Sequence, residues 1–295
     1  MTDHSPQTVP VEALARFCTE VLLAAGCDRE TARDATRAMM HGSVHGVDSH
    51  GVRLLPHYHK ALSGARVAVA PELRFGRTRP GTGMLDAAHG HGARAMFAAA
   101  GHACDLAAEA GIGAVGVTRS SHFGPAGAYA LEIADRGMMG LVFGNSDSMT
   151  RLHDGAVAFH GTNPMAVCLP APGNPWLLDM ATSAIPWNRV ELYRSLGVPL
   201  PEGAGSDAAG RDTTDPDDVA MLAPVGGAFG FKGAALAGVA ELFSGVLTGM
   251  PVGPDIAPMA GPDFATPRGM GAFVIALDPD AFAGSAVVAA GIAHY

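Results

Sequence analysis

Four side chains that could transfer protons or bind a metal ion lie within ten residues of the sequence: His41, His45, Asp48 and His50. Residues four apart share one face of a helix, so His41 and His45 have the spacing of metal ligands. The HExxH pattern of many zinc enzymes is absent from this stretch, and Asp48 and His50 fall in a glycine-flanked turn. Two interpretations therefore stay open: a metal-dependent hydrolase or lyase that uses the cluster, or a proton-transferring His50 next to Ser49.

Polar residues also follow three predicted buried strands. They are Ser121-His122 after the strand over 112–117, Asn145-Ser146 after the strand over 138–143, and Asp179 to Ser183 at the end of the strand over 176–180. In open α/β sheets, ligands bind at the carboxyl ends of the strands. The sequence therefore predicts a small-molecule site where these ends meet, although polar residues at strand ends also occur for purely structural reasons.

These segments must be positioned by an alternation of helices and strands. Apolar periodicity predicts helices over about residues 10–26, with Thr8 as the N-cap, and over 28–45, 54–62, 93–110, 126–135, 190–196 and 232–247. Strands are predicted over 112–117, 138–143, 167–170, 176–180 and 273–277, with two short extended pieces within 72–86. The stretch 199–227 is too long for an ordinary connection and is predicted to be a functional loop or an insertion. This order predicts an α/β body behind an all-helical N-terminal segment.

Two glycine-rich segments could be mistaken for nucleotide-binding loops. The run Gly111 to Gly116 matches GxGxxG, but the Rossmann fingerprint needs a strand before it and a helix after it. Here a helix precedes the run and a strand passes through it, so we expect Gly111 to cap the helix and Gly113 to lie in the strand. The Gly226–Gly233 loop is not a Walker loop, yet its Lys232 opens a helix, where it could approach a phosphate or carboxylate or simply be exposed.

Composition bounds the class of protein. Of 295 residues, 48% are apolar and 16% charged, and 28 acidic against 19 basic residues give a net charge of −9. A negative protein does not attract nucleic-acid phosphates or anionic membranes, so we expect no nucleic-acid or membrane partner. No signal peptide or membrane-spanning stretch is recognisable, and four cysteines without a CxxC pair are typical of reduced thiols. We therefore expect a cytoplasmic protein.

Taken together, the motifs resemble those of the type-2 malate/L-lactate dehydrogenase family, which includes ureidoglycolate dehydrogenase, sulfolactate dehydrogenase and reductases of cyclic imino acids such as piperideine-2-carboxylate. The matching segments occur in family order between about residues 40 and 250. They are Asp48-Ser49-His50-Gly51-Val52-Arg53, Ser121-His122-Phe123-Gly124, Gly144-Asn145-Ser146, Gly161-Thr162-Asn163-Pro164, Leu178-Asp179-Met180-Ala181-Thr182-Ser183, Thr213-Thr214-Asp215-Pro216 and the Gly226–Gly233 loop with Lys232.

The resemblance implies a fold and an activity. The fold would be α/β, with a non-Rossmann NAD(P)-binding mixed-sheet domain and an N-terminal helical segment. Residues 1–75 would form the helical segment with the catalytic histidine, 76–250 the body that binds cofactor and substrate, and 251–295 a C-terminal strand and helix returning to the N-terminal part. A homodimer would transfer a hydride between NAD or NADP and C2 of a small 2-hydroxy/2-oxo acid or a cyclic 2-imino acid.

The resemblance also implies which residues carry out proton transfer. His50 would give a proton to the carbonyl oxygen or imine nitrogen in reduction and remove it in oxidation. Asp179 would hold the His50 imidazole in the right tautomer, with Ser49 as a further catalytic residue. His122 is the second candidate for the proton transfer.

Ligand contacts are implied in the same way. Arg53 would bind the substrate carboxylate through two hydrogen bonds, with Thr162 also on the substrate side. No metal site is implied. The cofactor would contact His122, Ser146, Asp179, Met180, Ala181 and Lys232.

One segment departs from the family pattern. After the Asp179 motif many relatives carry a Gly-Lys pair, whereas this chain has Ile185-Pro186-Trp187-Asn188-Arg189. We expect Trp187 and Arg189 to alter substrate choice or the wall against the cofactor. Besides the dehydrogenase and the metal enzyme, a third alternative is a ligand-binding protein with the same fold and no catalysis.

Overall fold

The computed structural model describes residues 8–295. Its α-helices are α1 (Val11–Ala24), α2 (Arg29–Val44), α3 (Leu55–Ser63), α4 (Gly92–Ala110), α5 (Gly127–Ala134), α6 (Trp187–Leu196), α7 (Phe231–Glu241) and α8 (Ser285–His294). Two 3-10 turns, η1 (Asp48–His50) and η2 (Val52–Leu54), lie between α2 and α3, and a π-helical turn, η4 (Leu242–Val246), extends α7. The predicted helices are confirmed, with boundaries that differ by a few residues.

The main sheet has seven strands in the order β1-β2-β3-β12-β4-β7-β8. Their bounds are β1 (Arg74–Arg79), β2 (Thr82–Asp86), β3 (Ile112–Ser120), β4 (Met139–Gly144), β7 (Met165–Leu169), β8 (Trp176–Met180) and β12 (Met270–Leu277). β2 and β3 are parallel and the other neighbouring pairs are antiparallel, so the sheet is mixed, as expected. β12 enters between β3 and β4, where Val274 pairs with Val115 on one side and Val142 on the other.

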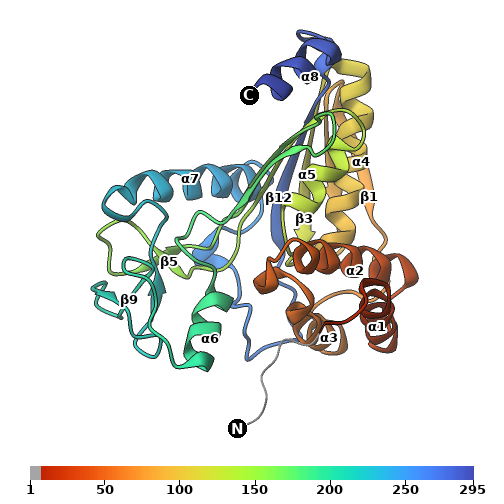
Figure 1. Cartoon of the computed structure of the whole chain (residues 1–295). Coiled ribbons are helices and arrows are strands. Elements are labelled where there is room, and N and C mark those ends of the chain that lie inside the picture. The colour runs from red at the N-terminus through yellow and green to blue at the C-terminus, as the bar shows by residue number, and fades with distance from the viewer. Residues whose placement is uncertain (1–7) are drawn as a thin grey trace.

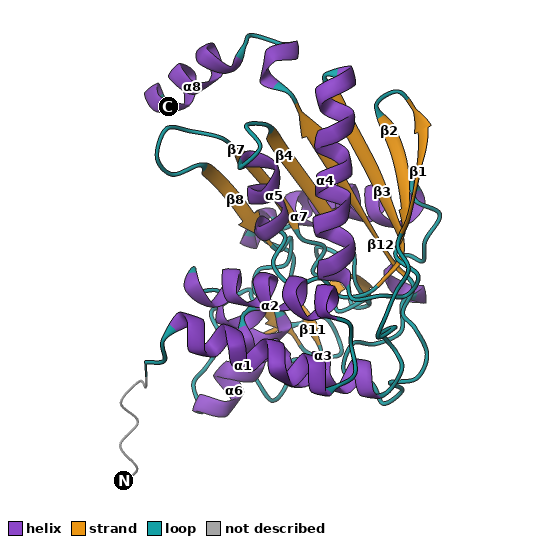
Figure 2. Cartoon of the chain, turned by 90° about the vertical axis from the view of Figure 1, so that its right-hand side faces the viewer, coloured by secondary structure: helices purple, strands orange, loops and turns teal. Residues whose placement is uncertain are grey.

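Helices cover both faces of this sheet (Figures 1 and 2). α4 and α5 pack on one face, and their alanines share a buried core with the sheet valines. α7 and η4 lie on the other face, where Ala240 packs with Phe143 and Phe273. At one end of the sheet α1, α2 and α3 form a core of their own around Leu22 and Met39.

A second, five-stranded sheet has the order β10-β9-β11-β5-β6. Its strands are short: β5 (Thr150–Arg151), β6 (Ala158–His160), β9 (Gly205–Ser206), β10 (Asp212–Thr213) and β11 (Met221–Leu222). The predicted loop or insertion over 199–227 supplies three of them, and with α6 it encloses a small core at Val190, Leu200 and Leu222. This small lobe stands opposite α1–α3 (Figure 1).

Three strand ends reach the same edge of the main sheet. β3 and β4 are both antiparallel to β12, and β8 has the direction of β4 because β7 is antiparallel to both. The segments after β3, β4 and β8 therefore emerge together, beside α1–α3 and the small lobe. The expected meeting of the polar strand ends is confirmed.

The glycine run at 111–116 is not a Rossmann turn. Gly111 caps α4 with a left-handed backbone at φ 79°, and β3 begins at the next residue. A Cβ on Gly113 would overlap the carbonyl group of Ala103, so the close packing of α4 on β3 requires glycine there. Both expectations for this run are confirmed.

Of the two N-terminal helices, α2 begins where the sequence predicts and α1 does not begin at the predicted cap. Asp28 caps α2, where its carboxylate accepts a hydrogen bond from Thr31 N at 2.7 Å. The assignment of Thr8 as the N-cap of the first helix is wrong, because Pro10 occupies that position and no side chain caps the helix there. The Pro10 carbonyl oxygen accepts the first hydrogen bond of the helix, from Leu14 N at 3.0 Å.

The segment after η4 first passes along the N-terminal helices and then ends at the far side of the main sheet. Its loop after η4 passes along α1–α3, where Met259 and Phe264 pack on their core and Arg66 Nη1 donates to the Met259 carbonyl oxygen at 3.2 Å. α8 lies at the opposite end of the main sheet (Figure 1). The expected return to the N-terminal part is thus made by this loop and not by α8. Within the described residues, no helix combines the length and apolarity needed to cross a bilayer.

Candidate active site

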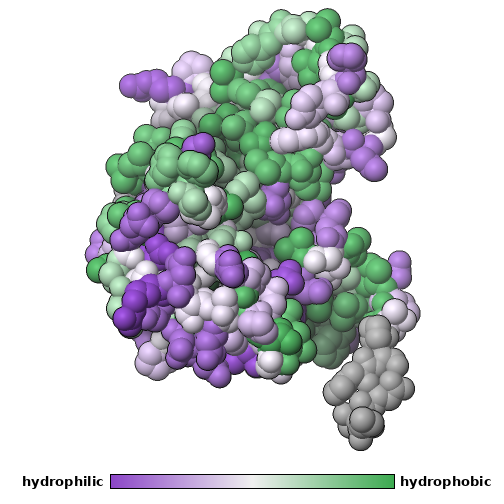
Figure 3. Space-filling view, turned by 60° about the vertical axis from the view of Figure 1, so that its left-hand side comes forward, coloured by the Kyte–Doolittle hydropathy of each residue, from purple (hydrophilic) through white to green (hydrophobic). Residues whose placement is uncertain are grey.

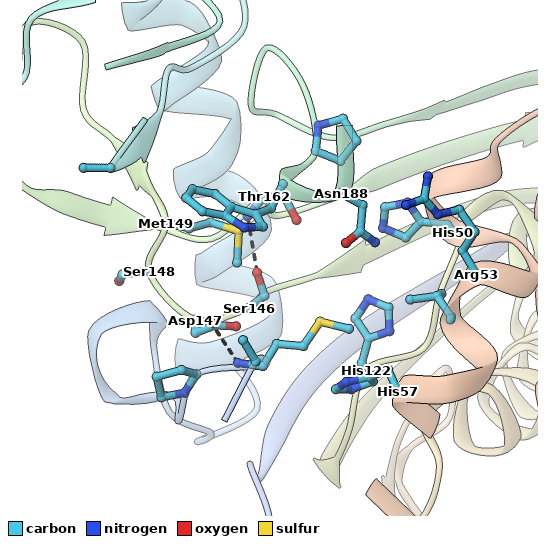
Figure 4. A pocket seen from close by; sticks show the side chains of 17 residues that line it. His50, Arg53, His57, His122, Ser146, Asp147, Ser148, Met149, Thr162 and Asn188 are labelled. Atoms are coloured by element: carbon cyan, nitrogen blue, oxygen red, sulfur yellow. Dashed lines mark hydrogen bonds between the residues drawn. The ribbon is translucent and has the colours of Figure 1, made fainter. Parts of the chain in front are cut away.

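A cavity of about 450 Å³ opens between α1–α3, the polar edge of the main sheet and the small lobe. The predicted site residues that line it are His50, Arg53, His122, Ser146 and Thr162. Figure 4 shows His50, His122, His57 and Arg53 on one side of this space and Ser146, Ser148 and Met149 on the other. The remaining lining residues are Leu54, Asp147, Pro186, Trp187, Asn188, Ala220, Pro258, Met259 and Ala260.

The turn that carries His50 is packed tightly against α2. A Cβ on Gly42 of α2 would fall 2.7 Å from the His50 carbonyl oxygen, and one on Gly51 would overlap the Ser43 hydroxyl. Ser43 Oγ accepts a hydrogen bond from Val52 N at 3.0 Å. Two glycines and one serine therefore allow η1 to lie directly on α2, which fixes the place of the His50 side chain.

The His50 imidazole lies beside the Ser49 hydroxyl and is largely removed from solvent. Its Nδ1 lies 3.0 Å from Ser49 Oγ, in hydrogen-bond contact with the neighbouring hydroxyl. Burial lowers the pKa of His50 to about 4, because a charged imidazolium is poorly solvated there. The ring is therefore neutral at pH 7 and can accept a proton.

His122 lies beside His50 at the same wall of the cavity. Its loop is held at the start of α4, where Ser121 Oγ accepts from Gly92 N at 2.9 Å and donates to Gly90 O at 3.0 Å. The His122 and His50 ring centroids are 5.9 Å apart and the rings are inclined by 26°. Burial, reinforced by the neighbouring His50, lowers the pKa of His122 well below its ordinary value. The two candidates for proton transfer are thus neighbours.

Sequence reasoning missed two residues of α3. His57 lines the cavity, and burial, together with the nearby Arg268, lowers its pKa to about 4. The Tyr58 hydroxyl lies 2.9 Å from His122 Nδ1. Both residues lie shortly after Arg53 in the sequence. A histidine-tyrosine pair so close to that motif could have indicated a role at the site.

Arg53 and two residues of α6 line the same cavity. Arg53 belongs to η2 and lines the cavity, which fits its predicted contact with a substrate carboxylate. Trp187 and Asn188 line the cavity from α6, whereas Arg189 is exposed and does not line it. Of the two substituted residues singled out in the sequence, Trp187 is therefore the one that can touch a ligand.

The buried carboxylate of Glu241 holds together segments next to the cavity. Glu241 of α7 accepts hydrogen bonds from Asn145 Nδ2 at 2.8 Å, Asn163 Nδ2 at 2.7 Å and Gly253 N at 2.9 Å. Burial alone would raise the pKa of Glu241, but these bonds and one with His160 outweigh it, so the pKa is lowered. A single acidic residue within the apolar stretch of α7 was the sequence signal for this network, and its role was missed.

The network places Ser146 and Thr162. Asn163 Oδ1 accepts from Ser146 N at 3.3 Å, and Ser146 Oγ accepts from Thr162 N at 3.3 Å, as the dashed line in Figure 4 marks. The Ser146 hydroxyl and the Thr162 main chain are therefore held at the cavity wall.

Asp179 has a different partner from the one predicted. Its Oδ2 accepts from Gly127 N at 2.9 Å and so caps the start of α5, where a helix dipole favours a carboxylate. Desolvation raises the pKa of Asp179, and the bond from Gly127 offsets part of that effect. In the described chain the His50 ring is hydrogen-bonded to Ser49 and not to Asp179, which does not line the cavity. The described structure thus shows Asp179 bonded at the start of α5, and its predicted action on the His50 ring stays a prediction.

Four predicted cofactor contacts, Asp179 among them, lie outside the cavity lining. Met180 ends β8 and Ala181 follows it, at the edge where the polar strand ends meet. Lys232 is exposed in the first turn of α7, with its Nζ 5.4 Å from the centroid of the Phe229 ring. Their contact with a cofactor stays a prediction.

The histidine cluster does not form a metal site. The His41 and His45 rings are tilted by 35° with centroids 4.3 Å apart, and His45 Nδ1 lies 2.8 Å from the His41 carbonyl oxygen. Across residues 8–295, no three His, Cys, Asp or Glu side chains are arranged to hold a metal ion. The geometry thus gives the metal-enzyme alternative no support.

The cavity lining has groups that suit a nicotinamide ring beside a small acid. The hydroxyls of Ser146, Ser148 and Thr162 supply hydrogen-bonding groups for a carboxamide, and Met149 and Trp187 supply apolar surface for a flat ring. The volume is within the range of small-ligand sites, roughly 300–1,000 Å³.

Comparison with known proteins also indicates a dehydrogenase of small acids. A family model described as Malate/L-lactate dehydrogenase matches residues 9–295. The malate dehydrogenase of Pyrococcus abyssi is 33% identical over 254 residues, which cover 84% of this chain and 70% of that protein. A Delta(1)-pyrroline-2-carboxylate reductase of Pseudomonas fluorescens is 30% identical over 278 residues, 94% of this chain and 82% of that protein. The solved structure of malate dehydrogenase from Pyrococcus horikoshii matches with a TM-score of 0.89 and 27% identity, over 100% of this chain and 82% of that one.

These similarities confirm the family resemblance read from the motifs and the α/β class of the fold. The similar proteins are dehydrogenases and a reductase, so the comparisons, like the geometry, do not support the metal-dependent hydrolase. The match extends over nearly the whole sequence, and the chain belongs to the malate/L-lactate dehydrogenase family.

Proposed function

We propose that this protein transfers a hydride reversibly between a nicotinamide cofactor and C2 of a small 2-hydroxy/2-oxo acid or a cyclic 2-imino acid. The observation that carries the proposal is the placement of His50, His122 and Arg53 at one cavity of about 450 Å³. That arrangement joins proton-transferring imidazoles to a guanidinium that can bind a carboxylate. Membership of the malate/L-lactate dehydrogenase family supports the same reaction class.

In this proposal the chain's own residues bind the acid and move its proton. Arg53 pairs with the substrate carboxylate, assisted by Thr162, and so presents C2 and its oxygen or nitrogen to the imidazoles. Ser49 orients His50, which removes the hydroxyl or amine proton in oxidation and returns it in reduction. A bound nicotinamide cofactor supplies the two-electron chemistry, accepting the hydrogen and electron pair of the C2–H bond in oxidation and returning them in reduction.

The cofactor is NAD or NADP. Curated relatives carry names with each of them, a ureidoglycolate dehydrogenase (NAD(+)) from Escherichia coli and a (2R)-3-sulfolactate dehydrogenase (NADP(+)) from Chromohalobacter salexigens. Ser146 and His122 at the cavity support contact with the nicotinamide end. For Asp179, Met180 and Ala181 at the sheet edge, and for Lys232 at the open start of α7, we propose contacts with the rest of the cofactor.

We also propose that the protein works as a homodimer in the cytoplasm. Large apolar side chains gather on an exposed face over α7 and η4, and Figure 3 shows hydrophobic surface on this side. They include Phe229, Phe231, Leu242, Val246 and Leu247. Such a patch is typical of a protein interface, and the four buried, unpaired cysteines suit a reducing compartment. We expect sedimentation equilibrium to give a molar mass twice that of one chain.

Oxidation of NADH and of NADPH, followed by absorbance, tests the reaction. The purified chain is mixed with pyruvate, oxaloacetate and a cyclic imino acid, with and without a chelator. Turnover of at least one of them that survives chelation is the expected result. Loss of turnover on chelation would return the metal enzyme to consideration, and cofactor binding without turnover of any acid would favour a binding protein.

A further inference from the structure

Tyr58 stands behind His122, on the side away from the substrate space. It belongs to α3 and is 2% exposed. Its hydroxyl lies 2.9 Å from His122 Nδ1, and within residues 8–295 no other partner reaches this hydroxyl. Its other close neighbour is His91, whose ring lies edge-on with its centroid 4.2 Å from that of Tyr58.

The direction of the Tyr58 hydrogen bond follows from its surroundings. A buried hydroxyl must place its proton on an acceptor, and the lone pair of His122 Nδ1 is the acceptor within reach. His91 does not compete, because its Nδ1 already accepts from Ala93 N at 3.1 Å. Burial also raises the pKa of Tyr58, so the phenol keeps its proton at neutral pH. Tyr58 is thus the donor in this pair.

A donor at Nδ1 determines where His122 carries its own proton. Burial lowers the pKa of His122, so the ring is neutral and holds one proton. With Nδ1 accepting from Tyr58, that proton is on Nε2. The ring lines the cavity, and in the described chain Nε2 has no protein partner.

We propose that Tyr58 is a positioning residue that holds His122 in the Nε2–H tautomer, so that His122 donates a hydrogen bond to the oxygen or nitrogen on C2. The inference rests on the proposed function and divides the work of the two neighbouring histidines. His50, whose Nδ1 faces the Ser49 hydroxyl, moves the proton. His122 stays neutral and stabilises the negative charge that develops on the substrate oxygen.

Two matched variants test the proposal. Tyr58→Phe removes the hydroxyl and keeps the ring. Tyr129→Phe is the control, because Tyr129 is equally buried and its hydroxyl donates to the Phe123 carbonyl oxygen and not to a histidine. Both variants lose one buried hydroxyl, so a general effect on folding should appear in both melting curves.

The tautomer is read directly by nitrogen-15 NMR of the histidine rings, with His122 assigned by its disappearance in His122→Gln. We expect wild type and Tyr129→Phe to carry the proton on Nε2, and Tyr58→Phe to show a mixture with the Nδ1–H form. Steady-state kinetics should show a fall of about tenfold in kcat for Tyr58→Phe, the size expected for one catalytic hydrogen bond, with KM nearly unchanged.

The results separate this inference from the proposed function. An Nδ1–H signal for His122 in wild type, or an unchanged tautomer and kcat in Tyr58→Phe, would overturn the role of Tyr58 even if the enzyme turns over its acid. Absence of turnover in wild type with an Nε2–H signal would instead overturn the proposed reaction, and leave the tautomer assignment standing.

Discussion

The side-chain amide of Asn188 donates a hydrogen bond to the main-chain carbonyl of Ser49, with 2.8 Å between Nδ2 and O. Asn188 lies on α6 beside the small lobe, and Ser49 lies on η1 among the N-terminal helices. The bond therefore joins two walls of the cavity at the turn that carries His50.

Replacing Asn188 should disturb that turn. Asn188→Ala is expected to lower kcat/KM for the acid by about tenfold, the cost of one hydrogen bond at the reacting site. Arg189→Ala is the control, since Arg189 is the next residue of α6 but is exposed and outside the cavity. Equal kcat/KM values for the two variants would show that the bond does not position the site.

His50→Ala should remove the proton carrier. We expect kcat to fall by about 10²-fold or more, in line with the loss of a general acid–base group. Cofactor affinity, measured by fluorescence titration, should persist. His45→Ala serves for comparison, because this histidine is exposed at the end of α2 and does not line the cavity. If His50→Ala retains its kcat, proton transfer must be reassigned to His122.

Arg53 should control affinity for the substrate carboxylate. Arg53→Ala is expected to raise KM for the acid by roughly 10- to 100-fold, the range for a charge-assisted hydrogen-bonded pair. Arg53→Lys keeps the charge but loses the planar fork, so its KM should lie between those of Arg53→Ala and wild type. A KM for Arg53→Ala equal to that of wild type would place the carboxylate elsewhere.

Asp179→Ala distinguishes a helix cap from a catalytic partner. Because Asp179 accepts from Gly127 N at the start of α5, its loss should cost about 1 kcal/mol of unfolding free energy in urea titrations. The pH dependence of kcat should keep its shape. A loss of kcat as large as that of His50→Ala would show that this carboxylate acts on the reaction after all.

Buried neutral histidines should make the fold sensitive to acid. The pKa is lowered by burial to about 4 in His50 and His57 and to about 3 in His91, against about 6.5 in an unfolded chain. The unfolded state therefore binds more protons below pH 6.5, and stability falls as the pH drops from about 6.5 towards 4. Each group contributes at most about 1.4 kcal/mol per pH unit there.

The urea midpoint measured at several pH values checks this expectation. His57→Gln removes one of the titrating groups, so its stability should depend less steeply on pH across the same range. A midpoint that stays constant between pH 6.5 and 4.5 would contradict the buried, neutral state of these rings.

The local features of the site were predictable from the sequence. Ser121-His122 and Asn145-Ser146 follow apolar stretches that form β3 and β4, and the Gly-flanked Ser49-His50 turn follows a clear helix. Strand and helix periods depend on neighbouring residues, so such segments can be recognised without the fold.

Long-range partners were not predictable in this way. The direction of the Asp179 side chain depends on where α5 begins, and the contact of Tyr58 with His122 depends on how α3 meets the edge of the sheet. Glu241 interrupts an apolar helix, which signals a buried polar group but not its partners on two other segments. Sequence patterns carry periodicity, whereas these contacts depend on tertiary packing.

The place of β12 has a consequence for biosynthesis. The strand Met270–Leu277 lies between β3 and β4 and is hydrogen-bonded to both. The two strands therefore cannot be joined into one sheet until the ribosome has released that segment. The edge that carries His122 and Ser146 must therefore assemble late, after most of the polypeptide has been made. Until then the valines of β3 and β4 stay exposed, where they can bind chaperones or aggregate, as in other sheets that are completed by contacts distant in sequence.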